Sequence, residues 1–226
     1  MSTKSKYTDD KPADEGRRKA ILTGALALTA LAVKAAPSSS STQSKRKPIM
    51  PPGAKNLQHF LGACIACHLC ISRCPSQVIR PAFTEYGLAG FMMPLMDYKQ
   101  SFCTYTCNTC STVCPTNALG KISMEDKNAL QIGRVTLNVE HCVVYRYETD
   151  CSSCAEHCPT QAVHMIPYKD ELRIPEIFPN TCIGCGACQY ICPVSPVTAI
   201  YVNGVTPQVL RPWEEMEDEL PENEEI

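Results

Sequence analysis

The spacing of the cysteines is the feature that most constrains what this chain can fold into. Residues 182–193 read Cys-Ile-Gly-Cys-Gly-Ala-Cys-Gln-Tyr-Ile-Cys-Pro, the pattern C-x2-C-x2-C-x3-C-P. This spacing is typical of a bacterial iron–sulfur loop, in which three thiolates hold one cluster and the fourth reaches a second cluster. Pro193 prevents the chain from continuing as a helix after the last ligand. Gly184 and Gly186 have no Cβ, so the backbone can approach inorganic sulfide closely.

The same pattern occurs three more times, and each run ends in Cys-Pro. The first run repeats the spacing unchanged, the second has one extra residue in its first gap, and the third has eight residues in that gap. The runs comprise Cys64, Cys67, Cys70 and Cys74; Cys103, Cys107, Cys110 and Cys114; Cys142, Cys151, Cys154 and Cys158; and Cys182, Cys185, Cys188 and Cys192. Together they use all 16 cysteines of the chain. Since each [4Fe–4S] cluster takes about four thiolates, we predict four clusters with these sixteen cysteines as ligands.

Two other roles for the cysteines compete with this one. Disulfide bonds are common in exported cysteine-rich chains, and C-x2-C pairs also bind zinc. Zinc sites do not require a third cysteine two residues on, followed by x3-C-P, so iron–sulfur clusters are favoured. The chain has only five Phe and one Trp. We therefore expect metal–thiolate bonds to supply much of the stability of the fold.

The N-terminal region resembles a targeting segment. Gly16-Arg17-Arg18-Lys19 precedes fourteen small or apolar residues, 20–33, and Val33-Lys34-Ala35 offers a cleavage site. A spanning helix needs about 20 residues, so this stretch suits a signal peptide. The arginine pair resembles a twin-arginine signal, although its flanking residues match only in part. We predict export of the folded protein to the periplasm; the alternative is an N-terminal membrane anchor.

Composition divides the chain into four segments. Residues 1–36 form the predicted signal or anchor, and residues 37–52 form a linker rich in Ser and Pro. Residues 53–212 form the predicted cluster domain. Residues 213–226 hold eight acidic and no basic residues, a pattern typical of a disordered tail. No basic pattern interleaved with aromatic residues is present, so nucleic-acid binding is not supported.

Local signals predict short elements between the cysteine runs. Asn56 should cap a helix that carries Leu57, Phe60 and Leu61. Ser123 should cap a helix that ends at Gly133, and residues 134–139 should form a strand. We expect one hairpin from residues 163–166 and 172–174, and another at residues 199–205, where Asn203-Gly204 favours a tight turn. The apolar stretch 91–96 should cover the first cluster or dock a membrane partner.

Two near copies show that the unit repeats internally. Residues 114–119 read Cys-Pro-Thr-Asn-Ala-Leu, and residues 158–163 read Cys-Pro-Thr-Gln-Ala-Val. Each unit consists of a cluster loop, a turn and a short strand. With four such runs in place, residues 50–210 resemble the MauM/NapG-type periplasmic ferredoxins. The long gap between Cys142 and Cys151 and the 123–126 segment before it also resemble that family.

The resemblance implies an electron carrier that is not an enzyme by itself. It implies a polytopic membrane ferredoxin or quinol dehydrogenase as electron donor and a periplasmic reductase as acceptor. The alternative is a fixed iron–sulfur subunit of a molybdopterin oxidoreductase. The residues point the same way, because an iron held by three sulfides and one thiolate has no open position for a substrate, whereas catalytic metals usually keep one.

The fourth cysteine of each run is expected to bind the cluster of a partner run, and the sequence allows two ways of pairing the runs. Sequential pairing joins run one to two and three to four; nested pairing joins one to four and two to three, as in the oxidoreductase subunits that this chain resembles. We predict nested pairing, because the near copies after Cys114 and Cys158 suit a symmetric middle pair. The predicted ligand sets are Cys64, Cys67, Cys70 and Cys192; Cys182, Cys185, Cys188 and Cys74; Cys103, Cys107, Cys110 and Cys158; and Cys142, Cys151, Cys154 and Cys114. The predicted fold is α+β, with two pseudo-symmetric bacterial-ferredoxin-like modules merged into one domain.

Overall fold

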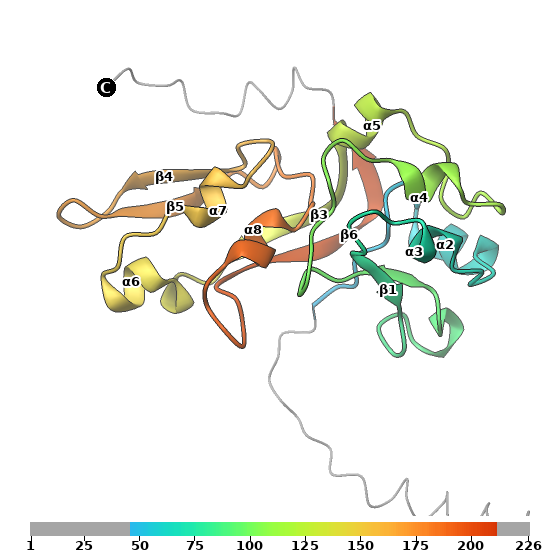
Figure 1. Cartoon of the computed structure of the whole chain (residues 1–226), viewed down its shortest axis with the longest axis horizontal. Helices are drawn as coiled ribbons and strands as arrows, with labels where there is room; N and C mark the ends of the chain where they lie inside the picture. The colour runs from blue at the N-terminus through green and yellow to red at the C-terminus, as the bar shows by residue number, and fades with distance from the viewer. Residues whose placement is uncertain (1–45, 212–226) are drawn as a thin grey trace, which may run out of the picture. The chain divides into compact units, whose positions relative to one another are not determined.

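Short helices and paired strands, separated by cysteine loops, make up residues 46–211, the part of the chain that this computed structural model describes (Figure 1). The α-helices are α2 (Leu57–Ala63), α3 (Leu69–Ser72), α4 (Thr109–Thr112), α5 (Met124–Ala129), α6 (Val143–Tyr147), α7 (Ser153–Glu156) and α8 (Ala187–Ile191). The 3-10 helices are η1 (Leu88–Gly90) and η2 (Val139–His141). The strands are β1 (Ile79–Pro81), β2 (Pro94–Met96), β3 (Leu130–Leu137), β4 (Val163–Pro167), β5 (Arg173–Ile177) and β6 (Ile200–Leu210). The described residues belong to one compact unit.

The described strands pair into three antiparallel two-stranded sheets. Strand β1 pairs with β2 between runs one and two, and β4 pairs with β5 between runs three and four. Strand β3 pairs with β6, from Leu130 opposite Leu210 to Leu137 opposite Ile200. In Figure 1 this sheet lies between α2, α3 and α4 on one side and the β4–β5 hairpin with α6 and α7 on the other. Short strands, short helices and cysteine loops in this order make a small ferredoxin-like α+β fold.

The predicted cap of helix α2 is confirmed. The Asn56 side chain accepts a hydrogen bond from the His59 N–H at 2.8 Å, which satisfies one of the free amides of the first turn. Phe60, the central residue of the helix, is fully buried. The helix therefore delivers the chain to Cys64 with a fixed direction.

The helix after Ser123 is shorter than predicted. Ser123 caps it by accepting from the Asp126 N–H at 2.9 Å, but the helix ends at Ala129 and the chain continues as strand β3. Gly133 therefore lies inside a strand and does not terminate a helix. The reason is tertiary packing, because a Cβ at Gly133 would lie 2.5 Å from Val202 Cγ1 and 2.8 Å from the Asn203 carbonyl oxygen. The glycine lets two segments approach closely rather than ending an element.

The predicted hairpin at residues 199–205 is wrong, whereas the predicted 163–174 hairpin is confirmed as β4–β5. Asn203 and Gly204 lie within the continuous strand β6. Gly204 donates its N–H to the Lys47 carbonyl at 3.1 Å, and a Cβ there would lie 2.0 Å from the Pro48 carbonyl oxygen. The glycine thus makes room for the incoming N-terminal segment, so the Asn-Gly pair does not form a turn.

The C-terminal strand holds the N-terminal segment of the described chain in place. Ile49, Met50, Pro51 and Pro52 are buried. The Gln208 side chain donates to the carbonyls of Met50 at 3.2 Å and Pro51 at 3.0 Å, and it accepts from the Gly53 N–H at 3.1 Å. One amide side chain therefore satisfies three buried backbone groups that lie more than 150 residues away in sequence.

The apolar stretch 91–96 is mostly interior. Met93 and all three residues of β2 are buried, and only Phe91 is more than half exposed. Pro94 lines the hollow beside the first cysteine run. The interpretation as a cover over the first site is therefore confirmed, and the stretch does not form an open docking surface.

Several predictions concern residues that lie outside the described part of the chain. The predicted signal segment 1–36, most of the linker 37–52 and the acidic tail 213–226 belong to this group. Among residues 46–211, no helix has the length and apolar character needed to cross a membrane.

Candidate iron–sulfur sites

The sixteen cysteines, all free, gather into four groups of four. Each group takes three cysteines from one run and the fourth from another run. Site 1 comprises Cys64, Cys67, Cys70 and Cys114; site 2 comprises Cys103, Cys107, Cys110 and Cys74; site 3 comprises Cys182, Cys185, Cys188 and Cys158; and site 4 comprises Cys142, Cys151, Cys154 and Cys192. The prediction that each run gives its fourth cysteine to another site is confirmed. The pairs of runs that exchange cysteines differ from the predicted pairs.

Three of these groups surround hollows of similar size. The hollows have volumes of about 330 Å³ at site 1, 300 Å³ at site 3 and 360 Å³ at site 4. No three His, Cys, Asp or Glu side chains between residues 46 and 211 are close enough to share one metal ion. The sulfurs of a site instead face one another across a space, which is the arrangement that a multi-iron cluster requires.

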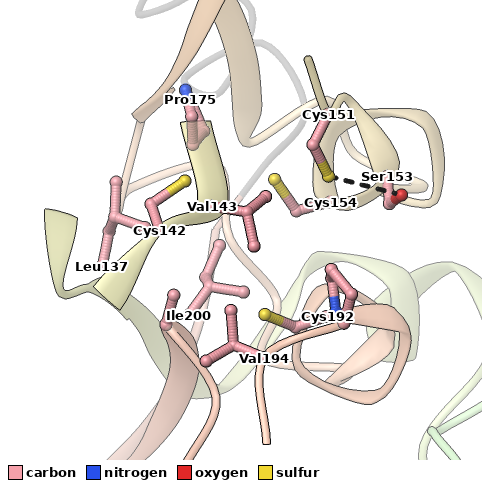
Figure 2. A pocket seen from close by; sticks show the side chains of 12 residues that line it. Leu137, Cys142, Val143, Cys151, Ser153, Cys154, Pro175, Cys192, Val194 and Ile200 are labelled. Carbon is pink, nitrogen blue, oxygen red and sulfur yellow. Dashed lines mark hydrogen bonds between the residues drawn. The ribbon is translucent and has the colours of Figure 1, made fainter. Parts of the chain in front are cut away.

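Site 4 shows this arrangement directly (Figure 2). The sulfurs of Cys142, Cys151, Cys154 and Cys192 point toward one hollow, together with apolar side chains that include Val194 and Ile200. Cys142 follows η2, Cys154 lies in α7 and Cys192 follows α8. Elements far apart in sequence therefore supply the four thiols of one site.

Site 2 is identified from the mutual influence of its thiols. Burial raises the pKa of Cys110 well above its usual value, and the negative charges of Cys103, Cys70, Cys107 and Cys74 raise it further. Burial likewise raises the pKa of Cys103 to about 12, with Cys107 and Cys74 again acting in the same direction. Since the other sites use twelve of the remaining cysteines, Cys74 completes the second run.

The nested pairing is wrong, since Cys74 lies with run two, Cys114 with run one, Cys158 with run four and Cys192 with run three. The connections between the runs give the physical reason. The β1–β2 hairpin returns the chain so that α4 lies against α3, and the β4–β5 hairpin returns it so that α8 lies against α7. Runs joined by a local hairpin meet first, because closing a short loop costs less entropy than closing a long one.

Sequential pairing nevertheless leaves one body. The Cys103 N–H donates to the Cys185 carbonyl at 2.9 Å, which links a loop of site 2 to a loop of site 3. The Tyr98 hydroxyl, fully buried, donates to the Gly184 carbonyl at 2.5 Å. Cys70 of site 1 lies close enough to raise the pKa of Cys110 in site 2, and Cys154 of site 4 likewise raises the pKa of Cys188 in site 3. The sites therefore follow one another in the order 1, 2, 3, 4.

The two loops of unchanged spacing share one backbone conformation. In run four, Gly184 and Gly186 have φ of +78° and +82°. In run one the equivalent residues, Ala66 and His68, have φ of +49° and +63°, a region that residues with a Cβ rarely adopt. The turn that wraps three thiols around a hollow is thus a requirement of the spacing, and glycine is its least strained solution.

Hydrogen bonds to sulfur follow the Cys-Pro-Ser/Thr sequences. The Leu119 N–H donates to Cys114 Sγ at 3.4 Å, and the Ala162 N–H donates to Cys158 Sγ at 3.1 Å. A hydroxyl two residues after the cysteine lies near the sulfur in three runs: Ser76 at 3.5 Å from Cys74, Thr116 at 3.8 Å from Cys114, and Thr160 at 3.8 Å from Cys158. After Cys192 the corresponding residue is Val194. Donors that face ligand sulfurs tune the potential of a cluster.

Most of the buried thiols resist ionisation on their own. Burial, reinforced by neighbouring thiolates, raises the pKa of Cys70, Cys154 and Cys182 to about 12. Cys114 is an exception, because its burial is outweighed by bonds from Leu119, Thr116 and Ala118, which lower its pKa. Thiolates crowded in this way need a cation between them, and iron bound in a cluster supplies that charge. The donor set, the hollows and the donors to sulfur therefore fit iron–sulfur clusters.

Sequence reasoning missed the residues around the sulfurs. The hydroxyls of Ser76, Thr116 and Thr160 could have been found, because each follows a Cys-Pro pair at the same offset. Lys127 could not, since its proximity to Cys103 and Cys185 depends on how helix α5 packs.

Comparisons with known proteins agree with this geometry. Residues 149–195 match the 4Fe-4S dicluster domain family. The chain is 32% identical over 203 residues to the methylamine utilization ferredoxin-type protein MauM of Methylorubrum extorquens, covering 80% of this chain and 86% of that protein. It is 28% identical over 155 residues to ferredoxin-type protein NapF of Escherichia coli K12 (69% and 86%) and 25% identical over 153 residues to NapG of the same strain (64% and 65%).

The fold and the thiol sites define an iron–sulfur electron-transfer protein of the ferredoxin type. Four cysteine loops that each end in C-x2-C-x3-C-P, with a match to the dicluster domain over residues 149–195, agree with this class. More particularly, the chain belongs to the MauM/NapG-type ferredoxin family.

Proposed function

We propose that the protein carries four [4Fe–4S] clusters and relays electrons from a membrane quinol-oxidising partner to a periplasmic reductase. The observation that carries the proposal is the unbroken succession of four four-thiol sites, linked at their centre by the hydrogen bond from Cys103 to Cys185. A succession of this kind suits the transfer of electrons from one cluster to the next. It does not suit storage at one place or conversion of a substrate.

The structure also supports a two-module description of the electron path. Runs one and two enclose the β1–β2 hairpin, and runs three and four enclose the β4–β5 hairpin. We infer two ferredoxin-like modules, one with sites 1 and 2 and the other with sites 3 and 4. Strands β3 and β6 pack against both modules, since Ile132 and Val202 belong to the core beside sites 1 and 2, whereas Val135 and Ile200 belong to the core beside site 3. The modules are also joined through Cys103, Cys185 and Tyr98.

The partners come from the resemblance to MauM/NapG-type proteins. MauM takes its name from methylamine utilization. Electron entry and exit require clusters close to the surface, and Cys67 of site 1 is exposed. Ile65 and Leu69 beside it are exposed as well, which would allow a partner to approach site 1 closely. We infer that one partner contacts the molecule at site 1.

We further propose that residues 1–36 direct export of the folded protein through the twin-arginine route, with retention as an N-terminal anchor as the alternative. Clusters are assembled in the cytoplasm, so a protein that carries them must cross the membrane folded. Replacing Arg17 and Arg18 with Lys should stop export, since the receptor recognises the guanidinium pair. Unchanged periplasmic accumulation of that variant would reject this route.

The main experiment measures cofactor content and then electron entry. Anaerobically purified protein should contain about sixteen iron and about sixteen sulfide per chain, four of each per cluster. Membrane vesicles from the host, supplied with a quinol, should reduce the clusters and bleach their absorbance. Vesicles from an unrelated host, which lack the partner proteins, should not. About eight iron, stoichiometric zinc, or equal bleaching with both kinds of vesicle would reject the proposal.

A further inference from the structure

Lys127 is a buried cation in the middle of the molecule. It lies in helix α5 and is only 4% exposed. Its Nζ donates to the carbonyl oxygens of Thr104 at 2.7 Å and Tyr105 at 2.9 Å, and it lies 5.6 Å from the centre of the Tyr105 ring. Lysine is almost never fully buried unless it is paired with an opposite charge. The ion pairs found within residues 46–211 all involve other residues, so no carboxylate in this part of the chain pairs with the lysine.

Lys127 lies beside cysteines of two cluster sites, whose bound clusters would supply the negative charge that pairs with it. The lysine lines a hollow of about 190 Å³ together with Cys103 of site 2 and Cys185 of site 3. These two cysteines are the ones joined by the Cys103 N–H to Cys185 carbonyl bond of 2.9 Å. Lys127 therefore lies where the two middle sites meet, within reach of one ligand of each.

A fixed positive charge in this position attracts any negative charge that a cluster bound at site 2 or at site 3 carries.

We propose that Lys127 is a shared counter-charge for the clusters of sites 2 and 3, and that it raises their reduction potentials relative to sites 1 and 4. The inference rests on the proposed four-cluster function. Reduction adds one electron, and so one negative charge, to a cluster while its ligands stay the same. A fixed cation nearby stabilises the reduced state more than the oxidised state, and net charge is among the factors that set cluster potentials. The charge of Lys127 therefore stabilises an electron on either of the two middle clusters.

The location also explains why one lysine suffices for two sites. Adjacent reduced clusters repel each other, and the repulsion is strongest where their ligands are in direct contact, as Cys103 and Cys185 are. A single charge placed at that contact offsets the repulsion for both. A surface lysine could not do this, because solvent screens exposed charges.

The test replaces Lys127 in the full-length protein and measures cluster potentials by EPR during redox titration. In Lys127→Met, whose unbranched side chain is uncharged and one atom shorter, the reduction equilibrium constant of two clusters should fall about tenfold, or about 59 mV for one electron. The other two clusters should keep their potentials. Lys127→Gln retains a donor for the Thr104 and Tyr105 carbonyls without the charge and should give the same shift. Lys121→Met removes an exposed lysine from the same segment and should shift none.

Cofactor loading keeps the outcomes distinct. Wild-type protein without about sixteen iron per chain refutes the four-cluster function itself. A fully loaded Lys127→Met protein with all potentials unchanged overturns the role of Lys127 alone. If the neutral variants load only about half the iron while Lys127→Arg loads fully, the charge is required for assembly, which supports the proposal. Equal iron loss in Lys127→Arg overturns it, because the residue would then supply shape and not charge.

Discussion

Replacing Gly184 with Ala should destabilise the loop that carries Cys182 and Cys185. Gly184 has φ of +78°, where an L-residue costs about 1–2 kcal/mol relative to ordinary backbone. A Cβ at this position would also lie 2.4 Å from the Gly133 nitrogen and 2.7 Å from its Cα and carbonyl oxygen. These are backbone atoms of β3, so relief requires moving the strand, and overpacking of this kind costs about 1–3 kcal/mol.

The expected total is about 2–5 kcal/mol, a large fraction of the about 5–15 kcal/mol that stabilises a typical domain. Clusters make thermal unfolding irreversible, so the rate of cluster bleaching at a fixed temperature is the suitable assay. The Gly184→Ala protein should bleach faster than wild type. Since site 3 depends on this loop, iron content should fall toward about twelve per chain, the content of three clusters.

Two comparisons separate the causes of this effect. Gly62→Ala is the control, because a Cβ there meets nothing within 4 Å and alanine is favoured over glycine in helix α2 by up to about 1 kcal/mol. Run one already places Ala66 at the equivalent position of its loop with φ of +49°. Positive φ alone therefore leaves a loop that still folds, at a cost of about 1–2 kcal/mol, and the rest of the expected loss comes from the contact with β3. A Gly184→Ala protein with wild-type iron content and bleaching rate would refute this packing argument.

Three further predictions test the sites. Cys114→Ser should remove or convert the cluster of run one and leave the EPR signals of run three intact, whereas a loss at run three would restore the nested pairing. Thr160→Val should lower the potential of one cluster by about 20–60 mV, from about 0.5–1.5 kcal/mol for a hydrogen bond that favours the reduced state. Val194→Thr, which adds the hydroxyl missing after Cys192, should raise the potential of another cluster by a similar amount; shifts of the same sign in both variants would refute the role of these hydroxyls. Chelating the iron under oxidising conditions should abolish the folded circular dichroism spectrum, because the thiols alone cannot hold the loops together, and an unchanged spectrum would contradict this.

The sequence predicted the parts of the fold that depend on local signals. The Asn56 and Ser123 caps, the β4–β5 hairpin and the grouping of the cysteines in threes all depend on residues a few positions apart. The spacing within a run determines which thiols share a loop, and this loop has the same shape in runs one and four. Local rules were sufficient for these features because their partners lie within one or two turns of the chain.

The errors share one physical cause, which is contact between distant segments. Gly133 and Gly204 resemble a helix end and a turn when only their neighbours are considered. Each instead allows another part of the chain to approach, Val202 and the Asn203 carbonyl in the first case and Pro48 in the second. The nested pairing failed for a related reason. The near copies at Cys114 and Cys158 indicate equivalent local turns, but they carry no information about which run lies across from them.

The hydrogen bonds between Gln208 and residues Met50, Pro51 and Gly53 affect the order in which the protein can fold during synthesis. The N-terminal segment of the first module is completed by the last strand to leave the ribosome, since these contacts join residues more than 150 positions apart. Domains commonly fold from the N-terminus while synthesis continues. In this chain the hydrogen bonds that hold residues 50–53 form only after Gln208 of β6 has been synthesised. A chain interrupted before β6 would therefore lack the hydrogen bonds that hold residues 50–53, although it would contain all eight cysteines of sites 1 and 2.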